Sequence, residues 1–245
     1  MPPSRYSPLR LNAPRAVILL VVATAIASIV GVVLERFGVP VVSGGVLVAA
    51  AVWQGQIWRL LTWVLFEIDP LSLIFSGLVT YWFGRDLCRI WGQMKFLAVY
   101  ALLAVATGAG TTVVCRLLGD QALAYQYLGT WPMSLALTLV WASRFPTATI
   151  NLYFAFPVRG QTLIWITVGG TVLYAVFKGL TPFVPHFLTA ALVLGTRALG
   201  RRRGPSYAGA GSGGPRGIWS SWSARRARSR YRVIDGGDKP PRYPN

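Results

Sequence analysis

Charged residues, and acidic residues above all, are scarce in this sequence. Only 13% of its 245 residues are charged, about half the usual share for a soluble domain. The chain has seven acidic residues and 24 lysines and arginines. Hydrophobic residues make up 54% of the chain. So little charge excludes an ordinary water-soluble domain and indicates an integral membrane protein, with lipids as its surroundings.

Cysteine and histidine are nearly absent. The two cysteines, Cys88 and Cys115, bracket one apolar segment. If that segment is a helix of about 28 residues, the two sulfur atoms lie roughly 40 Å apart. A disulfide between them is then excluded, so we expect two free thiols. We also expect no metal and no cofactor.

The net charge of +17 is concentrated at the C-terminal end. Twelve of the 24 basic residues lie at or after Arg197, against two acids there. They do not lie on a folded soluble face, so we do not expect a nucleic acid partner. Trp219, Trp222 and Tyr231 accompany the arginines, a composition that suits contact with anionic lipid. The alternative is a disordered basic tail that only fixes the topology.

Six long apolar runs predict an all-α polytopic membrane protein with six transmembrane helices. They cover residues 16–34, 60–83, 96–115, 131–143, 161–177 and 182–199. The fourth run is too short to cross a hydrocarbon core of about 30 Å unless it extends upstream or begins at membrane depth. We therefore predict a tail at 1–15, a six-helix membrane domain at 16–199, and a basic, flexible tail at 200–245.

The distribution of basic residues predicts that both termini are cytoplasmic. With the N-terminus inside, 20 of the 24 lysines and arginines fall on the inner side and only four on the outer side. The outer four are Arg36, Arg59, Arg116 and Lys178. The count of six spans and this orientation therefore support each other.

Stretches of small residues predict where helices approach closely. They lie at 107–110 in the third run, at 169–170 in the fifth, and at 189–195 in the sixth. Two acids, Glu67 and Asp69, fall inside the second run, where we expect them to pair with Arg59 or to stay solvated. Either arrangement indicates that the second helix begins later than its apolar run.

Several motifs resemble the rhomboid superfamily of intramembrane serine proteases and their inactive relatives. The Gly-Gln-Ile-Trp-Arg-Leu stretch that contains Trp58 and Arg59 is similar to a first-loop element of that superfamily, which derlins also carry. Phe83-Gly84 and the Phe-Pro-Val-Arg segment ending at Arg159 also resemble the family pattern. The resemblance covers roughly residues 15 to 199 and implies a six-helix rhomboid-like bundle.

The resemblance implies a catalytic serine in a Gly-x-Ser-Gly turn, and this chain departs from that pattern. The corresponding residues are Gly129, Thr130, Trp131 and Pro132, so Trp131 occupies the nucleophile position. Trp has no nucleophilic atom, and proline has no N–H to donate. We therefore expect no catalytic residue at this turn.

The remaining positions of this vestigial site are also altered. Ser72 and Ser76 occupy the positions of a histidine and an asparagine that hydrogen-bond the developing oxyanion, and both are shorter and weaker donors. His186 stands where the family keeps its catalytic histidine. It is either a vestige of the site or a neutral histidine that hydrogen-bonds a neighbouring helix or lies at the outer interface.

The sequence favours a proteolytically inactive, rhomboid-like protein that binds transmembrane segments or membrane-protein partners. An active protease that uses Ser134 and His186 is the alternative, because Ser134 lies about one helical turn after Trp131. A transporter is disfavoured, since no run carries paired buried charges. We expect the protein in a bacterial inner membrane.

The first-loop element has two interpretations. Trp58 and Arg59 are either an interfacial aromatic beside a snorkelling arginine, or a loop that enters the outer leaflet and perturbs the bilayer, as the resemblance implies.

Overall fold

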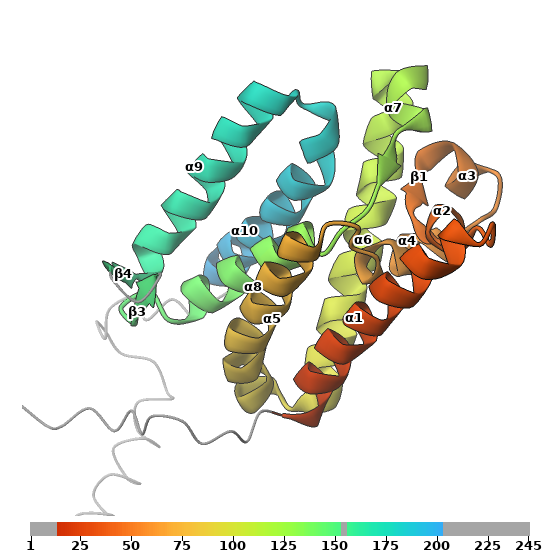
Figure 1. Cartoon of the computed structure of the whole chain (residues 1–245). Coiled ribbons are helices and arrows are strands. Elements are labelled where there is room, and N and C mark those ends of the chain that lie inside the picture. Colours follow the sequence, from red (N-terminus) through yellow and green to blue (C-terminus); the bar gives the residue numbers. More distant parts are fainter. Residues whose placement is uncertain (1–13, 153–155, 203–245) are drawn as a thin grey trace, which may run out of the picture. The chain divides into compact units, whose positions relative to one another are not determined.

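The computed structural model describes residues 14–152 and 156–202, and these are mostly helical. The described part contains six helices of 14 residues or more (Figure 1). They are α1 (Arg15–Arg36), α5 (Pro70–Trp91), α6 (Gln93–Leu118), α8 (Trp131–Arg144), α9 (Gly160–Lys178) and α10 (Val184–Arg202). Apart from residues 14–15 and 200–202, the predicted tails at 1–15 and 200–245 lie outside the described residues.

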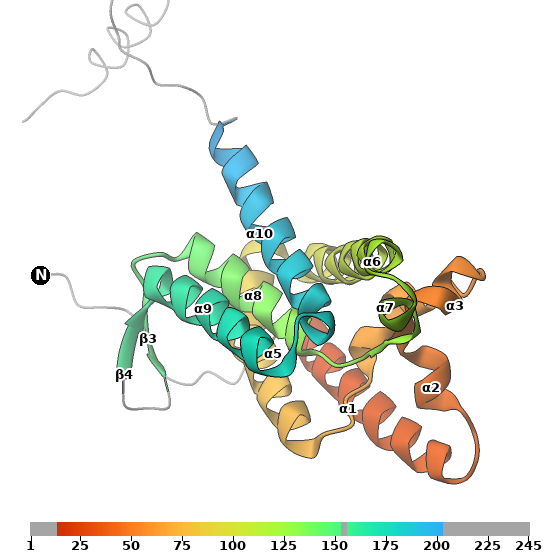
Figure 2. The ribbon, with the colours of Figure 1, turned by 90° about the horizontal axis from the view of Figure 1, so that it is seen from above.

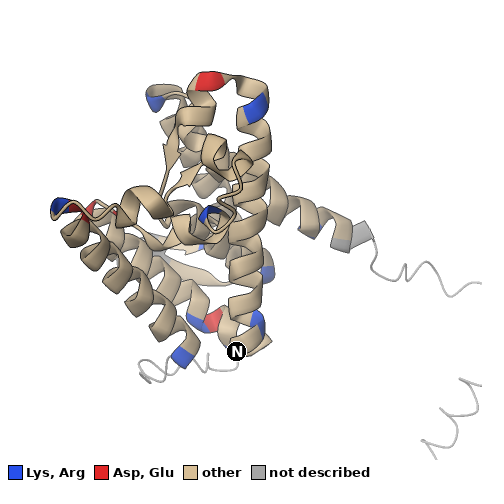
Figure 3. Cartoon of the chain, turned by 90° about the vertical axis from the view of Figure 1, so that its right-hand side faces the viewer, with Lys and Arg blue, Asp and Glu red and all other residues tan. Residues whose placement is uncertain are grey.

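Charges lie at the ends of the long helices and in the connections (Figure 3). The middles of these helices are apolar, so each can remain in lipid without burying an unpaired charge. The start of α1 lies beside the turn between α5 and α6, because the amide of Ala16 donates to Oε1 of Gln93. That turn passes through Gly92 at φ 82°, a conformation that favours glycine.

Four helices are long and apolar enough to cross a membrane, or five if one bent pair counts as a single span. The four lie at Arg15–Arg36, Gln93–Leu118, Gly160–Lys178 and Thr181–Leu199. The bent pair joins Arg59–Leu65 to Pro70–Trp91 at an angle of 101°. The chain is therefore a multi-pass membrane protein, and the second apolar run forms two helical pieces instead of one helix over 60–83.

The bend follows from the local sequence. Pro70 fixes the first turn of α5, and the Asp69 side chain accepts a hydrogen bond of 2.7 Å from the amide of Ser72. An acidic N-cap followed by proline is a strong helix start. The prediction that the second helix begins after the start of its apolar run is confirmed.

Short elements fill the first connection, between α1 and α5. They are α2 (Val41–Gly45), β1 (Leu47–Val48), α3 (Ala49–Trp53), α4 (Arg59–Thr62) and the 3₁₀ turn η1 (Trp63–Leu65). The connection between α6 and α8 contains α7 (Asp120–Ala124) and β2 (Gln126–Tyr127). Strands β1 and β2 pair antiparallel, so the two connections are joined by backbone hydrogen bonds.

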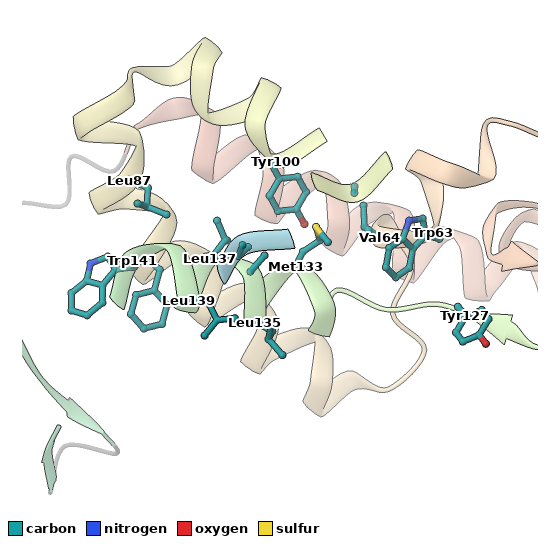
Figure 4. Packing of buried hydrophobic residues seen from close by; sticks show 14 of the residues in the cluster. Trp63, Val64, Leu87, Tyr100, Tyr127, Met133, Leu135, Leu137, Leu139 and Trp141 are labelled. Carbon is teal, nitrogen blue, oxygen red and sulfur yellow. The ribbon is translucent and has the colours of Figure 1, made fainter. Parts of the chain in front are cut away.

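Helix α8 forms the centre of the described bundle and packs against α5, α9 and α10 (Figures 1 and 2). Every residue from Pro132 to Leu139 is buried, although half of a typical amphipathic helix is exposed. Its side chains contribute much of the apolar core (Figure 4). A short helix that is apolar on all sides is thus surrounded by longer ones.

Two of the three predicted small-residue contacts are confirmed. A Cβ at Gly108 of α6 would lie 3.1 Å from the carbonyl oxygen of Leu60, so α4 approaches α6 closely there. The hydroxyls of Thr107 and Thr189 lie 3.1 Å apart and join α6 to α10. The prediction at 169–170 is wrong, since nothing lies within 4 Å of a Cβ built at either glycine. Those glycines lie on the exposed side of α9.

A β-hairpin between α8 and α9 was not predicted. Strand β3 (Thr149–Leu152) pairs antiparallel with β4 (Phe156–Arg159). Gly160 follows, and its missing side chain is necessary because a Cβ there would collide with the carbonyl oxygen of Phe145. The Phe-Pro-Val-Arg segment is thus the second strand of the hairpin that connects the two helices.

The two cysteines are free and buried in the structure. Cys88 lies near the end of α5, and Cys115 lies near the end of α6, where its sulfur is 3.2 Å from the hydroxyl of Tyr127. The prediction of two free thiols is confirmed.

Candidate functional site at the head of α8

The head of α8 is a tight turn followed by a tryptophan. Gly129 has φ 107°, Thr130 is the N-cap, and Trp131 and Pro132 begin the helix. The Trp131 side chain is 47% exposed, so the indole does not fill a buried cavity. The position that the sequence assigns to a nucleophile therefore presents a half-exposed aromatic ring.

A buried carboxylate holds this turn. Oε2 of Glu67 accepts hydrogen bonds from the amide of Thr130 at 3.1 Å and from its hydroxyl at 3.2 Å. Glu67 is only 8% exposed. The expectation that Glu67 pairs with Arg59 or stays solvated is wrong, because the bend before α5 turns this acid inward against α8.

The environment of Glu67 shifts the pKa of its carboxyl and accounts for the glycine beside it. Burial raises the pKa of the Glu67 carboxyl, and the hydrogen bonds from Thr130 oppose that rise. A Cβ on Gly129 would lie 3.0 Å from Oε2 of Glu67. Glycine thus allows both the positive φ and the close approach of the carboxylate.

Ser28 connects the same joint to α1. The amide of Glu67 donates to the Ser28 hydroxyl at 2.9 Å, and that hydroxyl donates to the carbonyl of Leu65 at 3.2 Å. Ser28 is 1% exposed. Hydrogen bonds therefore join α1, the bend before α5 and the head of α8.

The two serines at the oxyanion positions have other roles in this structure. The amide of Ser72 donates to the Asp69 cap, and Ser72 is partly exposed. Ser76 is buried, and its hydroxyl donates to the carbonyl of Leu73 at 3.2 Å. Ser76 also lines a small cavity among α1, α5 and α6. Neither serine is hydrogen-bonded to the turn at Gly129–Trp131.

Ser134 and His186 lie on α8 and α10, which pack against each other. Oγ of Ser134 is buried and has no hydrogen-bond partner, and the same is true of Nδ1 of His186. The imidazole packs against Phe183 instead, with ring centroids 5.0 Å apart. The structure thus buries both groups without joining them by the hydrogen bond that a catalytic pair needs.

Trp58 and Arg59 differ in exposure, although both donate to backbone carbonyls of residues 43–46. Trp58 is 54% exposed, and its Nε1 donates to the carbonyl of Gly44 at 3.3 Å. Arg59 is buried, and its guanidinium donates to the carbonyls of Ser43 and Val46 and to the side chain of Gln56. The interpretation of Arg59 as a snorkelling residue is wrong, because its charge is turned inward to close the first connection.

The described part has a helical bend after Trp58-Arg59, a glycine turn at the head of a short central helix and a hairpin before α9. The sequence of this part also matches a known protein family. The model of the rhomboid domain matches residues 54–196, more than half of the chain. The chain belongs to the rhomboid family. A search of curated proteins finds no match.

The link between Glu67 and Thr130 was missed at the level of sequence. A single acid in an apolar run is a signal for a buried carboxylate that needs donors, since an unpaired charge there is costly. The sequence does not reveal which donors it finds, because Thr130 lies 63 residues further along the rhomboid domain.

Proposed function

We propose that this rhomboid protein does not cleave peptide bonds and instead binds transmembrane segments of other membrane proteins. The observation that carries the proposal is Trp131 at the head of α8, where it offers no nucleophilic atom. An exposed indole on a rigid helix end is suited to contact with an apolar partner.

The hydrogen-bond donors of Thr130 in this turn are also already used. Acyl transfer requires N–H or O–H groups that are free to stabilise an oxyanion. The amide and the hydroxyl of Thr130 both donate to Glu67. The turn therefore combines a missing nucleophile with occupied donors.

In this proposal the partner helix binds between α5 and α9. Both helices pack on α8, but they are not among the helix pairs that pack extensively against each other. From Gly169 to the end of α9, Ala175 is the only buried residue. Large apolar side chains such as Trp165 and Phe177 are 72% and 80% exposed. A transmembrane segment can pack against this surface with van der Waals contacts.

The same proposal includes the topology. The six long helices correspond to six spans, with both termini cytoplasmic and α8 as a short span surrounded by protein. A backbone end at membrane depth is tolerated there because protein covers it. We further propose a bacterial inner membrane, with the basic C-terminal residues near anionic lipid.

Site-specific photocrosslinking tests the binding surface. A photoreactive residue is placed at Phe75 of α5 or Leu173 of α9, and as a control at Ile29 of α1. The chain is mixed in lipid vesicles with a set of single-span peptides of differing sequence. We expect crosslinks from α5 and α9 to some peptides and none above background from Ile29. Equal crosslinking from all three positions would indicate nonspecific contact and contradict the proposal.

Ser134 and His186 support a second candidate, a divergent serine protease. The observation in its favour is that both polar atoms are buried and unpartnered on neighbouring helices. Cleavage of the same peptides that is lost in both Ser134→Ala and His186→Ala would favour this candidate. Intact peptides favour the first.

A further inference from the structure

A small cavity lies inside the bundle, away from the exposed indole of Trp131. It has a volume of about 40 Å³ and lies between α1, α5, α6 and the head of α8. Five hydroxyl-bearing residues contribute to its lining, together with apolar residues and Gly77. The five are Thr24, Ser76, Thr80, Tyr100 and Thr130.

Two of these hydroxyls have no hydrogen-bond partner among the described residues. Those of Thr24, Ser76 and Thr130 donate to Leu20, Leu73 and Glu67, respectively. Thr80 and Tyr100 are 5% and 6% exposed and line the cavity, and among the described residues neither hydroxyl forms a hydrogen bond like those of the other three. Figure 4 shows the Tyr100 ring directed inward from α6.

An unpaired hydroxyl in a membrane interior is costly, because lipid cannot replace its missing hydrogen-bond partner. A ligand for this cavity must therefore both donate and accept hydrogen bonds. It must also be very small, because the cavity volume is about 40 Å³. One water molecule needs roughly 10–15 Å³ of such volume. No charged side chain lines the cavity among the described residues, so nothing there selects an ion.

We propose that this cavity is a binding site for one to three ordered water molecules. The waters hydrogen-bond to Thr80 and Tyr100 and to the remaining lone pairs of the Thr130 hydroxyl. They extend the polar link from Glu67 through Thr130 into the space between α1, α5 and α6. The waters thereby stabilise the head of α8 in addition to Glu67.

X-ray radiolytic footprinting of the full chain in lipid nanodiscs tests this site, because radicals that form from a bound water modify the side chains next to it. We expect Tyr100 to be modified several-fold faster than Trp63, which is also buried but does not line the cavity. A rate for Tyr100 no higher than that for Trp63 overturns the proposal.

Variants that change the cavity make the test specific. Thr80→Val removes one hydroxyl at nearly constant volume. Gly77→Ala adds a methyl group that meets Val21, also in the lining, at an ordinary contact distance of 3.5 Å. We expect each change to lower the modification rate of Tyr100 at least twofold. The control, Gly170→Ala, adds its methyl group in open space and should leave that rate unchanged.

If neither variant lowers the rate while both keep Trp63 protected, the cavity does not hold the water that modifies Tyr100 and the proposal fails. If a variant unfolds, Trp63 also becomes modified. The modification rates of Tyr100 and Trp63 in the unaltered chain then decide whether the proposal holds.

Discussion

Glu67 and Thr130 form a buried link in which one carboxylate oxygen accepts both the amide and the hydroxyl hydrogen of the same residue, at 3.1 and 3.2 Å. The link fixes the start of the central helix α8 to the bend before α5. It also occupies the donors beside the position where a rhomboid nucleophile is expected. The stability of the fold and the proposed loss of catalytic groups therefore involve the same pair of residues.

Replacing Glu67 with leucine should destabilise the protein. The amide and hydroxyl of Thr130 would lose their acceptor, and a buried unpaired donor costs about 1–3 kcal/mol. Glu67→Gln keeps an acceptor oxygen and should lose less than the leucine variant. Denaturant titration in mixed micelles gives the free energies of unfolding. Equal losses in the two variants would show that packing, and not hydrogen bonding, accounts for the role of Glu67.

Gly129→Ala should also destabilise the head of α8. The backbone has φ 107°, and the new Cβ would lie 3.0 Å from Oε2 of Glu67. Such a residue costs of order 1–3 kcal/mol in backbone strain alone. Gly119→Ala is the matched control, because Gly119 has φ 96° but no atom within 4 Å of a built Cβ. A loss at Gly129 no greater than that at Gly119 would exclude a contribution from the carboxylate contact.

Arg59→Met should loosen the first connection. The change retains much of the side-chain length but removes the donors to the carbonyls of Ser43 and Val46. Hydrogen bonds to charged groups are worth about 1.5–3 kcal/mol each, and the apolar replacement recovers part of that loss. Limited proteolysis should therefore cut residues 41–58 faster. Trp58→Met, at the exposed neighbour, should leave the rate nearly unchanged, and the opposite order would contradict the assigned roles.

Asp69 gives the fold an acid sensitivity at the start of α5. The hydrogen bonds with Ser72 lower the pKa of the Asp69 carboxyl below its ordinary value of 3.8. A lowered pKa in the folded state means that the cap stabilises above the unfolded pKa and is lost as the pH falls through the folded pKa. Asp69→Asn still accepts the cap hydrogen bond but does not titrate.

Thermal unfolding from about pH 6 to about pH 2 measures this effect. The unaltered chain should lose more stability below about pH 4 than the Asp69→Asn variant. Parallel curves for the two proteins would show that the cap does not contribute to the acid sensitivity.

The sequence predicted the helical, multi-pass character of the fold because apolar runs and helix breakers act locally. The start of α5 at Asp69-Pro70 is one example, since cap and proline lie next to each other in the chain. Contacts that depend on a bend were not predictable. Glu67 lies within the 101° change of direction before α5, and no periodicity reports that angle. Arg59 turns inward to carbonyls 13 and 16 residues earlier, a contact that local spacing does not indicate.

The residues of the candidate site stay a prediction, and its geometry could not be predicted from the sequence. The family resemblance pointed to Trp131 and His186 by position, and the helical spacing from Trp131 pointed to Ser134. It did not indicate that the indole is half-exposed or that two buried polar atoms on α8 and α10 lack partners. Such features depend on helix packing between distant segments. The β3–β4 hairpin was missed because its strands of four residues are too short for a clear alternation.

Labelling with an active-site-directed fluorophosphonate tests the central claim most directly. The pure chain in lipid is treated with the probe, digested and analysed by mass spectrometry, with Ser134→Ala treated in parallel. The account predicts no labelled serine in either protein, because Trp131 replaces the nucleophile and Ser134 has no base within hydrogen-bond distance. Labelling of Ser134 that disappears in Ser134→Ala, together with cleavage of a transmembrane peptide, would contradict it.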